Sequence, residues 1–280
     1  MKERVAIQGY PGSFHDEVSG QYFDRSVERV PADSFDILGS MLSSGTVQHA
    51  VMAIENSIAG TILQNYRILR EANFWIRGES YLRIKHNLCV TPGTNISQIR
   101  EVHSHPMAIN QCLSYLSQYP SIKLVETEDT ALSALQISRD QRNDVASISS
   151  INAAELYQLD MLAEGIETNK NNYTRFFVLS KNREEIHESA DKASIYIRIP
   201  DQKGQLLKVL QVIDDHDLNL SKLQSFPVLG AMREYFFHLD IEFDHISQYH
   251  ALRNDLQPIT RAYTELGIYK RASITNHTTN

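Results

Sequence analysis

The sequence of 280 residues predicts an α/β protein built in two parts. Up to about residue 180, short apolar strands alternate with amphipathic helices, a pattern typical of a largely parallel sheet covered by helices on both faces. A polar, charged stretch at 180–192 (SKNREEIHESADK) then interrupts the apolar pattern. Beyond it, strictly alternating apolar residues predict a smaller domain in the order βαββαβ, which is the ferredoxin-like arrangement.

The first part is predicted to hold strand–helix units in succession. Strands are expected at 5–9, 49–54, 101–104, 124–127 and 144–149. Ser34 is placed to cap the helix that begins with Phe35, and Ile58, Ile62 and Leu69 mark the helix after the second strand. The run RIKHNLCVTPG at 83–93 lies mid-domain, where we expect the chain to cross into a second lobe.

The second part is predicted from its change of pattern. We expect strands at 193–199, 218–226, 232–243 and near 267–272, with helices at 204–217 and about 246–256. The predicted domains are therefore 1–181 and 193–272, joined by a linker at 182–192 and followed by a flexible tail at 273–280.

Composition narrows the class of protein. The formal net charge of -7 is modest and scattered, which argues against nucleic acid or a membrane surface as a partner. No stretch approaches the roughly 20 apolar residues of a membrane span, and the N-terminus shows no signal-peptide pattern. Cys89 and Cys112 are expected to be buried free thiols in a reducing compartment. These features predict a cytoplasmic protein.

The chemistry is expected at four strand-to-helix junctions. They read GYPGSF (9–14), ENSIAG (55–60), SHP (104–106) and EDTA (128–131). A single Ser or Asp before a helix is usually only a cap, and Ser104 is placed as such a cap. Several polar junctions at the carboxyl edge of one sheet, however, converge on one cleft, where helix N-termini suit anions. GYPGSF lacks both GxxxxGK[ST] and GxGxxG, so a nucleotide is not supported.

A second segment expected to contribute to the functional site lies just before the linker and reads NNYTRFFVLS (171–180). An unpaired guanidinium is costly to bury, so Arg175 in this apolar strand is a candidate to bind a carboxylate. Thr174 and Arg175 are neighbours on a strand and therefore point to opposite faces unless the strand bends. Among the histidines, His86, His103 and His105 come nearest to a metal pattern, but no third ligand follows, so no metal site is expected.

These motifs together resemble those of prephenate dehydratases over residues 4–180. The matching stretches are GYPGSF, AIENSIAG (53–60), HNL (86–88), SHPMAINQC (104–112), EDTALSA (128–134) and NNYTRF (171–176). The resemblance implies a two-lobed catalytic domain similar to type II periplasmic binding proteins, with the active site between the lobes. It also implies a lyase of phenylalanine biosynthesis that needs no cofactor and removes carbon dioxide and water from prephenate to give phenylpyruvate.

The resemblance also implies roles for individual residues. Thr174 corresponds to the family's key threonine, which donates to the departing hydroxyl. Arg175 is expected to bind a substrate carboxylate, and Glu55 to organise its junction. The remaining residues expected at the substrate are Asn56, Ser57, Ser13, Ser104, His105 and Phe176.

The second part resembles an ACT domain, a ferredoxin-like module that binds amino acids between subunits. The family's GALV stretch appears as Gly204, Gln205, Leu206 and Leu207, and its ESRP stretch as Gln224, Ser225, Phe226 and Pro227. Asn219 and Leu220 belong to the same expected effector site. The resemblance implies feedback by phenylalanine in a homodimer or homotetramer, although Gln224 and Phe226 replace charged residues of the family pattern. Two alternatives stay open, an arogenate dehydratase and a non-catalytic amino-acid sensor.

Overall fold

The computed structural model describes residues 2–23, 26–228, 230 and 234–273. The chain divides into two compact units. Unit 1 comprises Met1–Ile68 and Ser80–Phe176, and unit 2 comprises Leu69–Glu79 and Phe177–Asn280. Within the described residues, no helix is long and apolar enough to cross a membrane.

The first lobe of unit 1 is built on parallel strands. β1 (Arg4–Gln8) lies between β2 (Glu28–Ala32) and β3 (His49–Asn56) and pairs in parallel with both. The sheet order is β2-β1-β3-β11-β5, and β4 (Gly60–Thr61) pairs antiparallel with β3. The strands β5 (Trp75–Arg83) and β11 (Tyr173–Ser180) each include residues of both units. The helices are α1 (Phe14–Phe23), α2 (Phe35–Ser44) and α3 (Leu63–Ala72).

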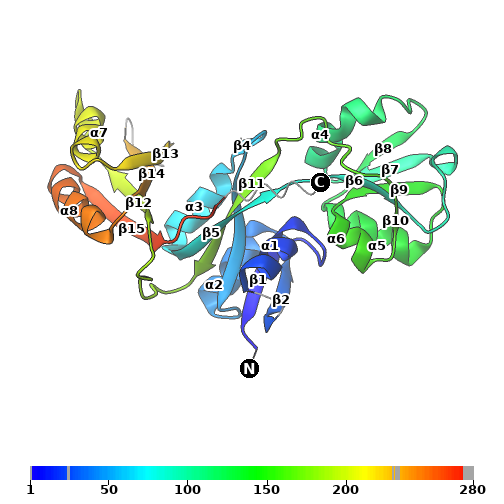
Figure 1. The fold of residues 1–280 in the computed structure, drawn as a ribbon, viewed down its shortest axis with the longest axis horizontal. Helices are drawn as coiled ribbons and strands as arrows, with labels where there is room; N and C mark the ends of the chain where they lie inside the picture. Colours follow the sequence, from blue (N-terminus) through cyan, green and yellow to red (C-terminus); the bar gives the residue numbers. More distant parts are fainter. Residues whose placement is uncertain (1, 24–25, 229, 231–233, 274–280) are drawn as a thin grey trace. The chain divides into compact units, whose positions relative to one another are not determined.

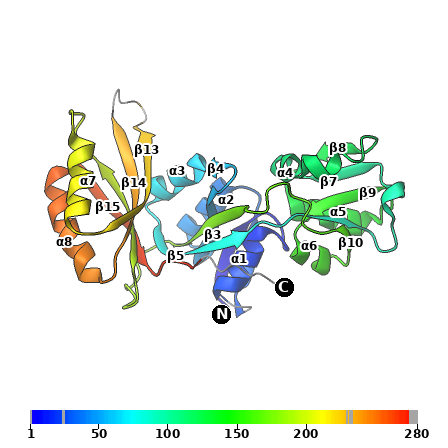
Figure 2. The ribbon, with the colours of Figure 1, turned by 45° about the horizontal axis from the view of Figure 1, so that its top comes forward.

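The second lobe of unit 1 has a mixed sheet in the order β10-β6-β9-β7-β8. Its strands are β6 (Asn87–Val90), β7 (Glu101–Ser104), β8 (Lys123–Glu126), β9 (Val145–Ser149) and β10 (Asp160–Ala163). The helix α4 (Pro106–Leu116) covers one face, and α5 (Thr130–Asp140) and α6 (Ile151–Leu156) cover the other (Figure 1; Figure 2). Successive residues of a strand point to opposite faces of the sheet, which explains the two helical layers. Leu88 packs with α4, while its neighbour Cys89 packs with α5 and α6.

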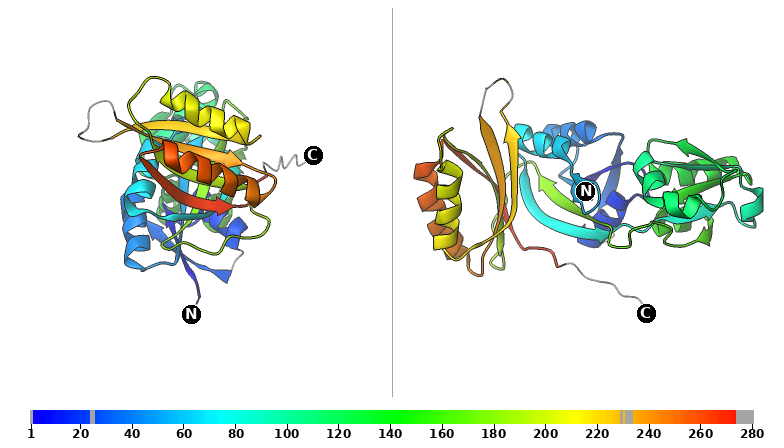
Figure 3. Two further views of the ribbon diagram at one scale, coloured as in Figure 1. Left: turned by 90° about the vertical axis from the view of Figure 1, so that its left-hand side faces the viewer. Right: turned by 90° about the horizontal axis from the view of Figure 1, so that it is seen from above.

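Unit 2 contains the predicted βαββαβ order. The elements are β12 (Lys192–Arg198), α7 (Gln205–Asp215), β13 (Asn219–Pro227), β14 (Tyr235–Glu242), α8 (Ile246–Leu256) and β15 (Ala262–Tyr269). The antiparallel sheet has the order β13-β14-β12-β15. Both helices lie on the same face of this sheet (Figure 3), where Ile195 and Ile197 of β12 meet Val209 and Leu252 in one buried cluster.

Several sequence expectations need correction. The helix after β3 begins at Leu63, so Ile58 and Ile62 lie in the connection before it. No strand was predicted at the positions of β2, β4, β5, β6 and β10, and β15 begins at Ala262 rather than near 267. The sheets are mixed rather than largely parallel, since β6 pairs antiparallel with β9 and β10.

The predicted domain boundaries stay predictions. The segment 181–191 holds no helix or strand, and β12 begins one residue before the expected start of the second domain. The start of the strand predicted at 232–243 and nearly all of the predicted tail lie outside the described residues.

Candidate active site

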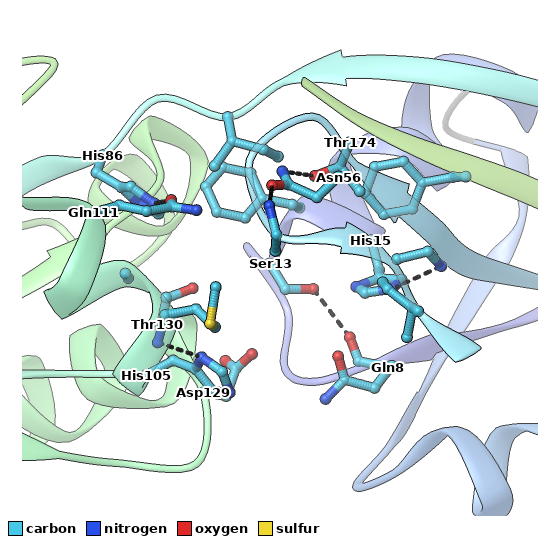
Figure 4. Close-up of a pocket in the computed structure, with 18 of the residues that line it drawn as sticks. Gln8, Ser13, His15, Asn56, His86, His105, Gln111, Asp129, Thr130 and Thr174 are labelled. Atoms are coloured by element: carbon cyan, nitrogen blue, oxygen red, sulfur yellow. Dashed lines mark hydrogen bonds between the residues drawn. The ribbon is translucent and has the colours of Figure 1, made fainter. Parts of the chain in front are cut away.

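Residues from all four polar junctions line one cavity of unit 1, with a volume of about 350 Å³ (Figure 4). The cavity is lined by Gln8, Ser13, Phe14, His15, Phe35, Ala53, Asn56, Ala59, Ile62, Ile84, His86, His105, Met107, Ala108, Gln111, Glu128, Asp129, Thr130, Thr174 and Phe176. The predicted convergence of the junctions on one cleft is therefore confirmed. This volume falls within the roughly 300–1,000 Å³ that small-molecule sites occupy.

The first junction reaches the second lobe because two glycines allow a close approach. Gly9 and Gly12 adopt φ values of 87° and 86°, a region that favours glycine. A Cβ atom on Gly9 would lie 2.6 Å from Asp129 Oδ2, and one on Gly12 would lie 2.8 Å from Ala153 Cα. Ser150 Oγ also donates to the Gly12 carbonyl across 2.6 Å. The loop before α1 is thus held against the starts of α5 and α6.

Helix starts supply several of the polar groups that line the cavity. Ser13 Oγ accepts from the N–H of Asp16 in the first turn of α1, and Asp129 Oδ1 accepts from two N–H groups in the first turn of α5. The lining contains no Lys or Arg among the described residues. An anion in this cavity would therefore be held by N–H groups and by the partial positive charge of the helix starts.

The cap of α4 differs from the sequence expectation. His105, not Ser104, is the N-cap, and its Nδ1 accepts from the N–H of Met107 across 3.2 Å. Ser104 is fully buried and donates from Oγ to the Ile148 carbonyl, so it ties β7 to β9 and does not line the cavity. His105 does line the cavity, as predicted.

Asn56 fixes the hydroxyl of Thr174. Asn56 Oδ1 accepts from the N–H groups of Ile58 and Ala59, which leaves its Nδ2 to act as the donor. Nδ2 lies 2.9 Å from Thr174 Oγ1 and 2.8 Å from Asn172 Oδ1. Because Thr174 Oγ1 accepts this bond, its own proton is left to act as a donor, and the side chain lines the cavity (Figure 4).

The hydrogen bonds continue from Asn172 into the second lobe. Gln111 Oε1 accepts from Asn172 Nδ2 across 2.8 Å and lies 2.9 Å from His86 Nε2. Since Gln111 Oε1 only accepts, His86 carries its proton on Nε2, and the amide nitrogen of Gln111 is left as a donor. One chain of polar contacts thus joins His86 to Thr174 across both lobes.

Burial sets the charge of the titratable lining residues. It lowers the pKa of His15 to about 3, and it also lowers the pKa values of His86 and His105. Burial raises the pKa of Asp129, against the lowering effect of the backbone N–H groups that it accepts. The three imidazoles are therefore neutral at pH 7 and act as hydrogen-bonding groups rather than as cations.

Four residues that the sequence assigned to the substrate do not line the cavity. Ser104 is one, and Glu55 is another. Ser57 instead binds the backbone, because its Oγ donates to the Asn171 carbonyl and accepts from the Tyr173 N–H. Arg175 is buried, and its guanidinium carbon lies 6.0 Å from the centre of the Tyr81 ring. Strand alternation explains this, since Thr174 and Phe176 face the cavity and Arg175 lies between them.

Sequence reasoning missed several lining residues. His15, His86, Gln111 and Asp129 were not assigned to the site, although each lies in or next to a stretch of family resemblance. EDTA and SHP were recognised as polar junctions, and this signal could have pointed to Asp129. No local signal distinguishes Gln111, which is one polar residue on an amphipathic helix.

A second cavity, of about 340 Å³, lies in unit 2 at the start of α7. Gly204, Gln205, Leu206 and Leu207 line it together with residues that include Asp201, Tyr235 and Phe237. The other predicted effector residues lie on β13, an edge strand, and do not line it. Phe226 is buried there, with its ring 6.3 Å from that of Tyr196.

Comparisons with known proteins agree with this architecture. A sequence model of prephenate dehydratase matches residues 5–184. The bifunctional chorismate mutase/prephenate dehydratase of Enterobacter agglomerans is 32% identical over 97% of this chain and 71% of its own length. An arogenate dehydratase/prephenate dehydratase of Arabidopsis thaliana is 35% identical over 86% of this chain and 65% of its own length.

Two solved structures are similar over nearly the whole chain. One is described as GqqA, a novel type of quorum quenching acylase, with a TM-score of 0.86 and 27% identity over 97% of this chain and 99% of that one. The other is a prephenate dehydratase from Arthrobacter aurescens in complex with L-Phe, with a TM-score of 0.85 and 27% identity over 96% of this chain and 90% of that one. The predicted two-lobed α/β fold is confirmed, and the chain belongs to the prephenate dehydratase family.

Proposed function

We propose that the cavity of unit 1 converts prephenate to phenylpyruvate and that Thr174 supplies the hydrogen bond to the departing hydroxyl. One observation carries this role. Thr174 Oγ1 accepts a hydrogen bond from Asn56 Nδ2 across 2.9 Å, so the hydroxyl proton is left to act as a donor in the cavity. Membership of the prephenate dehydratase family supports the reaction.

The reaction needs little from the protein beyond binding and a proton. The bond from the ring to its carboxylate breaks and releases carbon dioxide, and its electron pair enters the ring. The hydroxyl at the opposite ring carbon leaves with one proton as water, and the ring becomes aromatic. The dianion plus one proton therefore gives phenylpyruvate, carbon dioxide and water, with no electron donor or acceptor in the balance. A site of fixed donors around a rigid cavity suits this chemistry.

Binding of the dianion is assigned to neutral donors. Ser13 and His105 line the cavity at the starts of α1 and α4, and N–H groups at the same helix starts supplement them. Phe176 contributes an apolar wall against the ring. A free threonine hydroxyl is a weak acid, so Thr174 polarises and positions the leaving group while these donors hold the carboxylates.

The role of Thr174 is tested with two variants. Thr174→Ala removes the hydroxyl and is expected to lower kcat for phenylpyruvate release by at least about 100-fold, as for other positioned donors. Thr174→Ser keeps the hydroxyl and is expected to retain more than about a tenth of kcat. Circular dichroism and thermal unfolding should show both variants folded. Near-normal turnover by the alanine variant would remove Thr174 from the mechanism.

Two other activities are measured in the same experiment. The Arabidopsis relative bears both the arogenate and the prephenate dehydratase names, so arogenate is assayed beside prephenate. The similarity to a structure described as an acylase makes amide hydrolysis a second candidate, and release of free acid from an N-acylated compound would support it. A chain that binds prephenate but releases no phenylpyruvate would be a sensor rather than an enzyme.

We infer that residues 193–272 form an ACT domain that binds phenylalanine between two copies of the chain. The βαββαβ order and the cavity beside Gly204–Leu207 support this, and the Arthrobacter relative is a complex with L-Phe. Because the two predicted effector stretches do not line one cavity within a chain, a homodimer or homotetramer would bring them together. Isothermal titration with phenylalanine and light scattering test both statements, and an absence of saturable binding or a monomer would contradict them. The cytoplasmic location stays a prediction.

A further inference from the structure

We propose that His15 selects a 2-keto acid over the corresponding 2-amino acid by directing an Nδ1–H group into the cavity at the start of α1. The inference rests on the proposed function and adds a specificity-determining residue to it. His15 is the second residue of α1, is nine-tenths buried and lines the cavity (Figure 4).

One hydrogen bond determines which nitrogen of His15 carries the proton. The backbone N–H of Ala53 donates to His15 Nε2 across 3.3 Å, so Nε2 is the unprotonated nitrogen. Burial lowers the pKa of His15 to about 3, which leaves the ring neutral at pH 7. The single ring proton is therefore on Nδ1, and Nδ1 has no hydrogen-bond partner among the described residues.

Two aromatic rings hold the imidazole in place. Phe176 meets it edge to face, with ring centres 5.0 Å apart and planes at 90°, and Phe35 lies 5.5 Å away. Together with the bond from Ala53, these contacts fix the plane of the ring. The Nδ1–H group consequently keeps one direction, which is the property that a selecting group requires.

The surroundings of His15 are rich in donors. α1 is ten residues long, and the N–H groups of Phe14 and His15 in its first turn have no hydrogen-bond partner among the residues that the structure describes. Phe14 and His15 both line the cavity, and the helix start adds partial positive charge there. The oxygen atoms of a keto acid accept such bonds, whereas an ammonium group would set N–H against N–H and positive charge against positive charge.

The carboxylates near the start of α1 are already paired. Asp16 forms an ion pair with Arg29 and accepts from the N–H of Gly12. Asp129, which approaches the loop before α1 at Gly9, is engaged by N–H groups of α5. Glu128 belongs to the junction before α5. The start of α1 is therefore assigned to the pyruvyl group of prephenate, which carries an amine in arogenate.

Two substitutions distinguish the acceptor function of His15 Nε2 from the donor function of Nδ1. His15→Gln can place Oε1 near the position of Nε2, which keeps the acceptor for Ala53 and removes the donor. His15→Asn can place Nδ2 near the position of Nδ1, which keeps the donor and removes the acceptor. Both variants replace the ring by a neutral amide, and each keeps one of the two hydrogen-bonding functions of the imidazole.

The measurement is kcat/KM for prephenate and for arogenate in the full-length protein. The wild type is expected to favour prephenate, and His15→Gln is expected to reduce the ratio of the two values by about tenfold or more, while His15→Asn keeps it within about threefold. An unchanged ratio in His15→Gln, or a wild-type preference for arogenate, would overturn the proposal while leaving the dehydratase activity established. A wild type that releases phenylpyruvate from neither substrate, with a normal circular dichroism spectrum, would overturn the proposed function itself.

Discussion

The side chain of Asn56 donates to Thr174 Oγ1 across 2.9 Å, although the two residues lie 118 positions apart in the chain. The contact depends on the sheet, because β3 and β11 are neighbours in the order β2-β1-β3-β11-β5. The turn after β3 then fixes the amide through the N–H groups of Ile58 and Ala59. A tight turn in the first lobe thereby orients the hydroxyl that we assign to the leaving group.

The first prediction concerns this amide. Asn56→Asp replaces the Nδ2 donor by an acceptor, so the Thr174 proton turns towards the new carboxylate and away from the substrate. The added negative charge also repels a dianion. We expect kcat for prephenate to fall by about 100-fold or more. Asn95→Asp introduces the same charge at an exposed cap of the second lobe and should leave kcat unchanged. Steady-state assays of both variants check this, and more than a third of wild-type kcat in Asn56→Asp would contradict it.

The second prediction concerns Arg175, which the sequence assigned to a substrate carboxylate. Its side chain is buried, lies beside Tyr81 and does not line the cavity. Arg175→Lys is therefore expected to change KM for prephenate by less than about threefold. It should lower the free energy of unfolding by about 1–3 kcal/mol, because an ammonium cannot reproduce the planar contacts of a buried guanidinium. Kinetics and urea unfolding separate the two effects, and a large rise in KM with unchanged stability would return Arg175 to the substrate.

The third prediction concerns the close approach of Gly9 to Asp129. Gly9→Ala and Gly45→Ala both place a side chain at positive φ, but a Cβ on Gly9 would lie 2.6 Å from Asp129 Oδ2 while one on Gly45 meets nothing within 4 Å. Gly45→Ala should cost about 1 kcal/mol of stability and leave activity unchanged. Gly9→Ala should cost more and should lower kcat/KM, because Asp129 and the start of α5 must move. Equal effects of the two substitutions would show that the contact between the lobes has no part in the site.

The elements that were predicted correctly are those encoded by local apolar patterns and short motifs. The helix at Phe35–Ser44 with its Ser34 cap follows from apolar spacing, and so do α4, α8 and the βαββαβ order. Junction chemistry also located the cavity. The strands β2, β5 and β10 were missed because their side chains do not alternate cleanly, and β2 carries Pro31, which an edge strand tolerates.

The assignment of Arg175 to the substrate and the omission of His15 have a common physical origin. Both roles depend on which way a side chain points once two distant segments pack together. Arg175 looked costly to bury, but the sequence shows no sign that Tyr81 lies beside it. In the sequence, His15 is one more polar residue in the first turn of a helix. Only the structure shows its contacts with Phe35, Ala53 and Phe176.

The fourth prediction is a loss of stability in acid that originates at His15. In the unfolded chain its pKa is near 6.5, whereas burial lowers it to about 3 in the folded protein. As the pH falls below 6.5, His15 binds a proton in the unfolded state but not in the folded state. The free energy of unfolding therefore decreases. The slope for one such group is about 1.4 kcal/mol per pH unit, and it persists until the pH approaches the folded value.

Comparison with His15→Gln isolates this contribution. Burial also lowers the pKa of His86, which adds a loss of the same sign, while burial raises the pKa of Glu17 to about 6, which adds stability as the pH falls. These groups are present in both proteins and cancel in the difference. Urea unfolding at pH 7 and pH 5 should therefore show a smaller decrease for the glutamine variant, by about 2 kcal/mol. Identical decreases in the two proteins would mean that His15 takes up its proton on Nε2 in the folded state, and the hydrogen bond from the Ala53 N–H would be lost at the same pH.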